Sequence, residues 1–130
     1  MFFVLAARVD RLVTGGLGRS EAETETAAVL QEAERMVLPH LRAEHRDVVG
    51  ALEAVGTPAA AAIAEDLMVD QAVLRNAITA LRHFLATRRD HGRVLVAFAA
   101  GLQRHAVLFR DAVDPWVEAH EGRPAGIVEA

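Results

Sequence analysis

Apolar side chains recur at helical spacing along nearly the whole chain, and no stretch has the two-residue alternation of a strand. The first run covers 2–13 and stops at Gly15-Gly16, which predicts a short helix. A second helix is expected to open with a capping box formed by Ser20 and Glu23. The apolar faces of these two helices are predicted to contain Phe2, Leu5, Ala6, Val9, Leu12 and Val13, and then Thr26, Val29, Leu30, Ala33 and Val37.

Prolines and glycines divide the rest of the chain. Pro39 is expected to end or kink the second helix, with a shorter helical piece over 41–55 after it. Gly56-Thr57-Pro58 combines a helix-ending glycine, an N-cap and a first-turn proline, so a third helix is predicted from there to about residue 87. A tight turn at 88–90 leads into a last helix toward residue 120. The apolar stripe predicted for the third helix contains Ile63, Leu67, Leu74, Ile78, Leu81 and Leu85. The stripe predicted for the last helix contains Val94, Phe98, Leu102, Phe109, Val113 and Trp116.

These helices predict an all-α protein, an up-down antiparallel four-helix bundle with a short first helix. A length of 130 residues suits a single domain, which we place at 1–120, followed by a frayed tail over 121–130. The composition is 52% hydrophobic but only 5% aromatic, which favours close packing of helices through Ala, Leu and Val. The short first helix would leave an apolar groove on its neighbours, so a homodimer or a protein partner is expected on that face.

Composition excludes several classes of function. The net charge is −4, and the 14 basic residues form no dense cluster, so no nucleic-acid partner is expected. The absence of cysteine excludes disulfides and thiolate metal sites. No window approaches the roughly 20 apolar residues of a membrane span, and the start lacks a basic signal region, so we expect a cytoplasmic protein that does not enter the membrane.

Polar residues interrupt two of the apolar stripes at one level of the predicted bundle. Asp70 and Gln71 stand between Leu67 and Leu74 on the third helix, and His105 lies at the centre of the last stripe. Counted from the turn between the two helices, these groups fall in nearly the same layer. Two interpretations remain open: a core pair in which Asp70 or Gln71 accepts a hydrogen bond from His105, or a layer that binds a metal or a small ligand.

The remaining histidines give weaker signals. His40 and Glu44 are four residues apart and could share a metal, although such pairs are common on helices. His45 could join a similar arrangement with a neighbour. His83 lies on the face opposite its apolar stripe, and we expect it to be solvated.

Three segments together resemble a known family. The segments 34–41, 70–75 and 105–116 are similar to motifs of the hemerythrin-like (HHE) cation-binding proteins. That resemblance implies a four-helix bundle that holds two irons between its helices through histidines and bridging carboxylates. Carried over residue by residue, only His105 matches a ligand. The other ligand positions are filled by Val29, Ala33, Gln71 and Phe109.

The resemblance therefore implies a degenerate member of the family, because one ligand cannot hold two irons. We expect a non-enzymatic binding or interaction module without a cofactor, in which apolar side chains fill the former site. The alternative is a residual cation site in which His105, Asp70 and Glu34 hold iron or another divalent metal. We expect no enzyme, since the sequence shows no nucleophile paired with a base and no phosphate-binding loop.

Overall fold

The computed structural model describes residues 2–16, 18–87 and 92–120, and every regular element in these ranges is helical. The first helix is α1 (Phe2–Thr14). The second is a long helix built from α2 (Arg19–Glu32), η1 (Ala33–Val37), α3 (Leu38–Glu44), η2 (His45–Val49) and α4 (Gly50–Val55). α5 (Pro58–Thr87) is the third, and α6 (Gly92–Leu108), η3 (Phe109–Val113) and α7 (Asp114–Ala119) form the fourth. The all-α four-helix prediction is confirmed.

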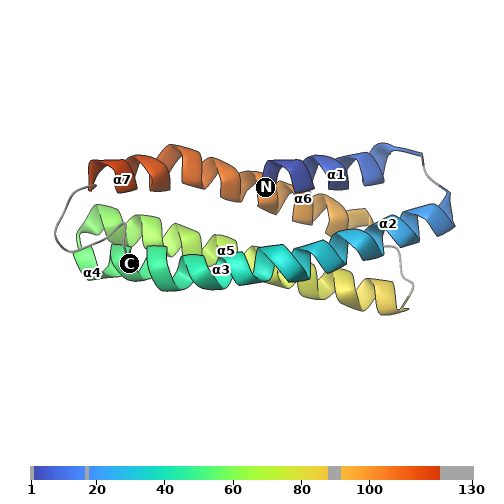
Figure 1. Ribbon diagram of the computed structural model, residues 1–130, viewed down its shortest axis with the longest axis horizontal. Coiled ribbons are helices and arrows are strands. Elements are labelled where there is room, and N and C mark those ends of the chain that lie inside the picture. Colours follow the sequence, from blue (N-terminus) through green and yellow to red (C-terminus); the bar gives the residue numbers. More distant parts are fainter. Residues whose placement is uncertain (1, 17, 88–91, 121–130) are drawn as a thin grey trace.

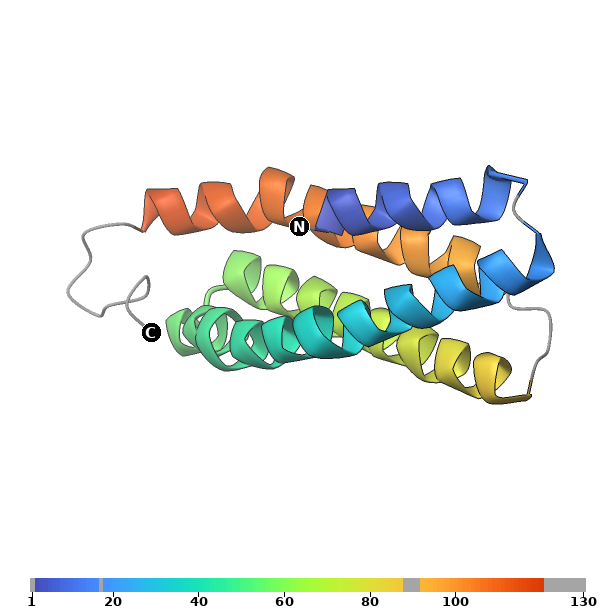
Figure 2. The ribbon, with the colours of Figure 1, turned by 45° about the vertical axis from the view of Figure 1, so that its right-hand side comes forward.

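The helices pack in two layers (Figures 1 and 2). α1 and the fourth helix form one layer, and the second helix and α5 form the other. α1 packs mainly on α6, and α5 packs against α6 from the other layer. Figure 1 shows that α1 extends along only one half of the bundle, with the N-terminus near its middle. The short first helix is therefore confirmed.

The helix boundaries follow local chemistry at two of the three predicted signals. Helix α1 ends just before Gly15, and Gly16 adopts a φ of +66°. Gly56 closes α4 with a φ of +71°, and the Thr57 Oγ1 accepts a hydrogen bond from the Ala60 N–H at 3.2 Å. The predicted capping box is wrong, because Gly18 is the N-cap of α2 and Ser20 lies inside the helix. The turn at 88–90 and the tail over 121–130 lie outside the described residues.

Pro39 does not end the second helix, which continues through it. It follows the π-helical turn η1, in which the Leu38 N–H donates to the Ala33 carbonyl five residues back. In a regular α-helix the proline ring would clash with the carbonyl four residues before it, and a wider turn relieves that clash. Pro115 follows η3 in the same way. The helix therefore continues past Pro39, and this continuation positions the site described below.

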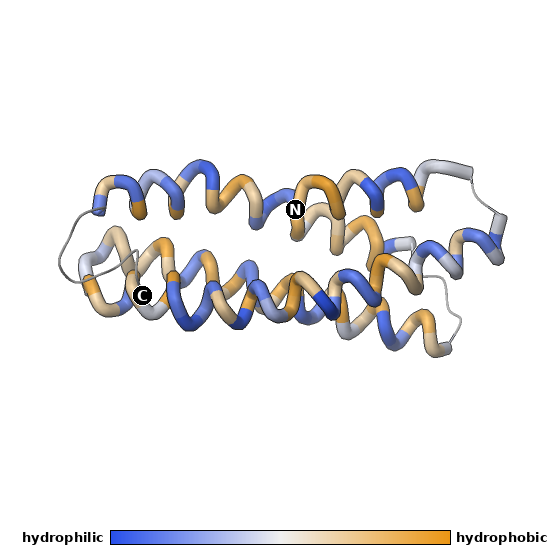
Figure 3. The backbone as a smooth tube through the Cα atoms, in the orientation of Figure 1, coloured by the Kyte–Doolittle hydropathy of each residue, from blue (hydrophilic) through white to orange (hydrophobic). Residues whose placement is uncertain are grey.

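The apolar stripes form two core clusters. The larger lies where all four helices meet and includes Phe2, Val29, Leu74 and Phe98. The smaller lies in the half that α1 does not reach and includes Leu52, Leu67 and Val113. Figure 3 shows that hydrophobic and hydrophilic positions alternate along each helix, as amphipathic packing requires.

Several predicted core positions are less deeply buried than expected. Val13 is exposed, and five others are only half-buried: Ile63, Leu85, Val94, Phe109 and Trp116. His83 is exposed, as predicted. Among the described residues, the large apolar side chains that remain exposed lie on α1, α5 and α6: Phe3, Val4, Val13, Met68, Val69, Val96 and Val107. No helix of the described chain is both long and apolar enough to cross a membrane.

Candidate metal centre

Four polar side chains are buried together where α3, α5 and α6 meet. Glu44 closes α3, Asp70 and Gln71 lie in the middle of α5, and His105 lies near the end of α6. Each of these four is at most 4% exposed. His40, one helical turn before Glu44, completes the group, and its side chain is 46% exposed. The site therefore joins a closed interior to the protein surface.

His105 is held by carboxylates on both ring nitrogens. Its Nδ1 lies 2.5 Å from Asp70 Oδ2, and its Nε2 lies 2.8 Å from Glu44 Oε2. The other oxygen of Asp70 accepts a hydrogen bond from Arg104 Nε at 3.1 Å. This arrangement fixes the plane of the imidazole and points Nε2 toward Glu44.

Glu44 is oriented just as firmly. Its Oε2 faces both His105 and His40, whose Nε2 lies 3.1 Å away. Its Oε1 accepts a hydrogen bond from Gln71 Nε2 at 3.0 Å. Gln71 is itself held by the Leu41 carbonyl and by His45 Nδ1. Gln71 therefore leaves one oxygen of Glu44 directed at the two histidines.

The charges of this network balance. Burial works to lower the pKa of His105, but the hydrogen bonds to Asp70 and Glu44 outweigh it and raise that pKa to about 9. Burial likewise works to raise the pKa of Glu44, but hydrogen bonds from His105, His40 and Gln71 outweigh it and lower that pKa. Without a cation, His105 is thus protonated at neutral pH between two carboxylates, and Arg104 offsets the second negative charge.

The donor atoms also suit a metal cation. The ligand atoms of His40, Glu44 and His105 all lie within 4.8 Å of one another, and we call these three residues the His–Glu–His cluster. Two ligand atoms about 2.1 Å from one ion lie about 3 Å apart in octahedral coordination and about 3.4 Å apart in tetrahedral coordination. The spacings of 2.8 and 3.1 Å around Glu44 Oε2 are close to the first of these values. Metal-bound histidines also commonly donate their second ring N–H to a carboxylate, as His105 can to Asp70.

The sequence placed some of these residues correctly. The structure brings Asp70 and His105 together, with Asp70 in the acceptor position that the core-pair interpretation expects. Gln71 bonds to Glu44 rather than to His105. Glu34 is not part of the group: it is partly exposed and forms an ion pair with Arg82. Val29 and Ala33, the positions compared with family ligands, are buried in the apolar core.

Glu44 is the central residue of the group, and sequence reasoning gave it too little weight. Its signal was the four-residue spacing from His40, which places both side chains on one helical face. The expected break at Pro39 hid the consequence of that spacing. The second helix continues through η1, and Glu44 at the end of α3 meets His105.

No protein-family model, curated protein or solved structure matches this chain. The hemerythrin-like resemblance therefore remains a prediction from the sequence.

Proposed function

We propose that the protein binds one divalent transition-metal cation through His40, Glu44 and His105. The observation that carries this proposal is the grouping of three donor atoms from two helices within 4.8 Å of one another, with Asp70 behind His105. Two imidazoles and one carboxylate suit zinc or ferrous iron, and they suit calcium or magnesium poorly because those ions prefer several oxygen ligands. When bound, the cation would supply Lewis-acid or redox chemistry at its remaining coordination positions.

The surrounding residues support a site for one ion rather than two. Gln71 donates a hydrogen bond to the second oxygen of Glu44, and Asp70 accepts one from the second nitrogen of His105. Neither atom is free for a neighbouring ion. The proposed site thus differs from the two-iron centre that the family resemblance implies.

A matched pair of histidine variants tests the proposal. His40→Ala removes one ligand from a side chain that is 46% exposed, and His83→Ala removes an exposed histidine elsewhere. The proteins are first stripped of metal with a chelator and then titrated with zinc in a calorimeter. We expect one site per chain in the wild type and in His83→Ala. His40→Ala should lose more than the roughly 10–100-fold in affinity that removal of an outer-shell partner costs. Equal affinities in all three proteins would contradict the assignment.

A second candidate function is that of a metal-free bundle acting through protein contacts. It is supported by the completeness of the network: among the described residues, every buried side-chain nitrogen or oxygen has a hydrogen-bond partner. In that case the proton on His105 takes the place of a cation, and exposed apolar residues on α1 such as Phe3 and Val4 contact the partner. Wild-type protein that binds no zinc or iron at micromolar concentrations would favour this second candidate.

A further inference from the structure

The aromatic ring of Phe2 covers the His–Glu–His cluster. Its centroid lies 4.9 Å from that of the His105 ring and 5.1 Å from that of His40. The Phe2 side chain is only 6% exposed, although it stands at the start of the first helix. Phe109 packs against His105 at 5.1 Å. His105, a buried member of the cluster, is thus packed between two phenylalanine rings.

Helix α1 holds Phe2 in place from further along its length. Arg8 joins α1 to the second helix through hydrogen bonds to Glu25 at 2.9 Å and to Glu32 at 2.7 Å. Val9 and Leu12 are buried against the bundle, and α1 ends just before Gly15. The ion pairs therefore restrain the middle of α1, whereas the first turn rests on side-chain packing.

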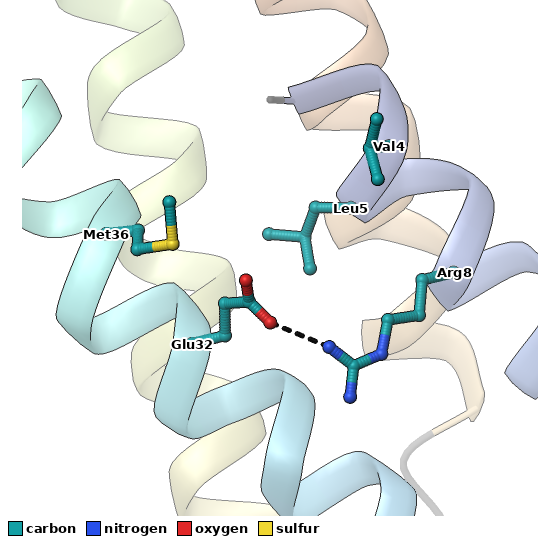
Figure 4. A pocket seen from close by; sticks show the side chains of 5 residues that line it. All are labelled: Val4, Leu5, Arg8, Glu32 and Met36. Carbon is teal, nitrogen blue, oxygen red and sulfur yellow. Dashed lines mark hydrogen bonds and ion pairs between the residues drawn. The ribbon is translucent and has the colours of Figure 1, made fainter.

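A cavity lies beside this first turn. It has a volume of about 310 Å³ and is lined by Val4, Leu5, Arg8, Glu32 and Met36 (Figure 4). Leu5 is three residues after Phe2 and Met36 is four residues before His40, so the cavity lies about one helical turn from these two residues along each helix. The first turn of α1 therefore has space next to it.

We infer that Phe2 controls how fast a cation enters and leaves the His–Glu–His cluster. The ring packs on the imidazoles of His105 and His40, so we expect the first turn of α1 to slow exchange of the ion. This inference rests on the proposed cation binding. In this role Phe2 contacts the ligands and controls access to them, but it donates no atom to the ion.

Neighbouring phenylalanines provide a matched test. Phe2→Ala removes the cover, whereas Phe3→Ala removes a side chain that is 51% exposed. Zinc-loaded proteins are mixed with excess chelator in a stopped-flow instrument, and release of the ion is followed. We expect Phe2→Ala to release zinc at least about tenfold faster than wild type, a change equal to about 1.4 kcal/mol in the barrier. Phe3→Ala should stay within about twofold of wild type.

Two further measurements separate access from general stability. Phe2→Leu keeps apolar bulk over the site, so its release rate should lie between those of wild type and Phe2→Ala, and this variant serves if Phe2→Ala fails to fold. The visible spectrum of bound cobalt(II) should be the same in all variants, because the ligands are unchanged. Equal release rates in wild type and all Phe2 variants would overturn the role of Phe2 and leave cation binding intact. Absence of zinc binding in the wild type would instead overturn the proposed function itself.

Discussion

Asp70 shows how a residue that does not face the proposed cation can still determine its binding. It is 4% exposed and accepts a hydrogen bond from His105 on one oxygen and from Arg104 on the other. A carboxylate in this place fixes the orientation of the imidazole and increases the basicity of its other nitrogen. The affinity of the site should therefore depend on the charge of Asp70.

Replacement of Asp70 tests this dependence. Asp70→Asn keeps an oxygen that can accept from His105 but loses the charge, so we expect zinc affinity to fall by about 10–100-fold. Asp66→Asn removes an exposed carboxylate one turn earlier on α5 and is the control. Calorimetric titration of both variants gives the comparison. An equal loss in the two variants would indicate a general effect of charge and would contradict the role given to Asp70.

The same network predicts how the stability of the metal-free protein depends on pH. The pKa of His105 is raised to about 9, so its contribution to stability is complete below its ordinary value of 6.5 and is lost as pH rises through 9. The pKa of Glu44 is lowered, so its contribution is complete above 4.5 and is lost as pH falls through the lowered value. Stability should peak between about pH 4.5 and 6.5 and fall by about 3 kcal/mol toward pH 10. Urea unfolding in chelator across this range is the measurement, and a flat profile between pH 6 and 10 would contradict a charged His105.

At the scale of the helices, Pro58 marks a boundary that the sequence predicts correctly, whereas Pro39 suggests a helix end that the structure does not have. Helical periodicity, the Gly56-Thr57-Pro58 boundary and the burial of Val29, Leu74 and Phe98 are all set by local chemistry, and the structure agrees with them. The π-helical turn before Pro39 lets the second helix continue, whereas a proline in a helical pattern ordinarily predicts its end. A single sequence carries no simple signal for such a turn. The contact between Glu44 and His105 could therefore not be predicted from the sequence. The contact between Asp70 and His105 could, because both residues lie at a similar distance along their helices from the turn that joins them.

Two glycines of the second helix should respond in opposite ways to the same substitution. Gly56 has a φ of +71°, where an alanine is strained, so Gly56→Ala should destabilise the protein by about 1 kcal/mol. Gly50 has a φ of −58° and open space where a Cβ would lie, so Gly50→Ala should stabilise it by about 0.5–1 kcal/mol. Thermal or urea unfolding of the two variants decides the matter. Effects of the same sign would contradict these backbone assignments.

At the scale of the whole molecule, the proposed cation connects the second helix to the fourth. His40 and Glu44 come from α3 and His105 from α6, while Asp70 extends the network to α5. A ligand that binds only the folded state stabilises it by about 2.7 kcal/mol at a concentration of 100 Kd. The site also lies where α1 begins, because Phe2 contacts His40 and His105. It therefore links the half of the bundle that α1 covers to the half that it leaves open.

Cation binding should consequently raise the melting temperature. At 100 Kd of zinc we expect an increase of about 10 °C in the wild type, measured by differential scanning calorimetry. Glu44→Gln removes the charged ligand and should show little increase. Glu53→Gln, an exposed glutamate on α4, should behave as the wild type does. A similar increase in all three proteins would place the bound ion elsewhere.

The most direct test of the central claim is the metal content of the purified protein. Untagged protein, purified without chelator from cells supplied with zinc and iron, is analysed for both elements together with its His40→Ala variant. We expect one ion per chain in the wild type and a strongly reduced content in His40→Ala. Two ions per chain, or none, would contradict a single cation held by His40, Glu44 and His105.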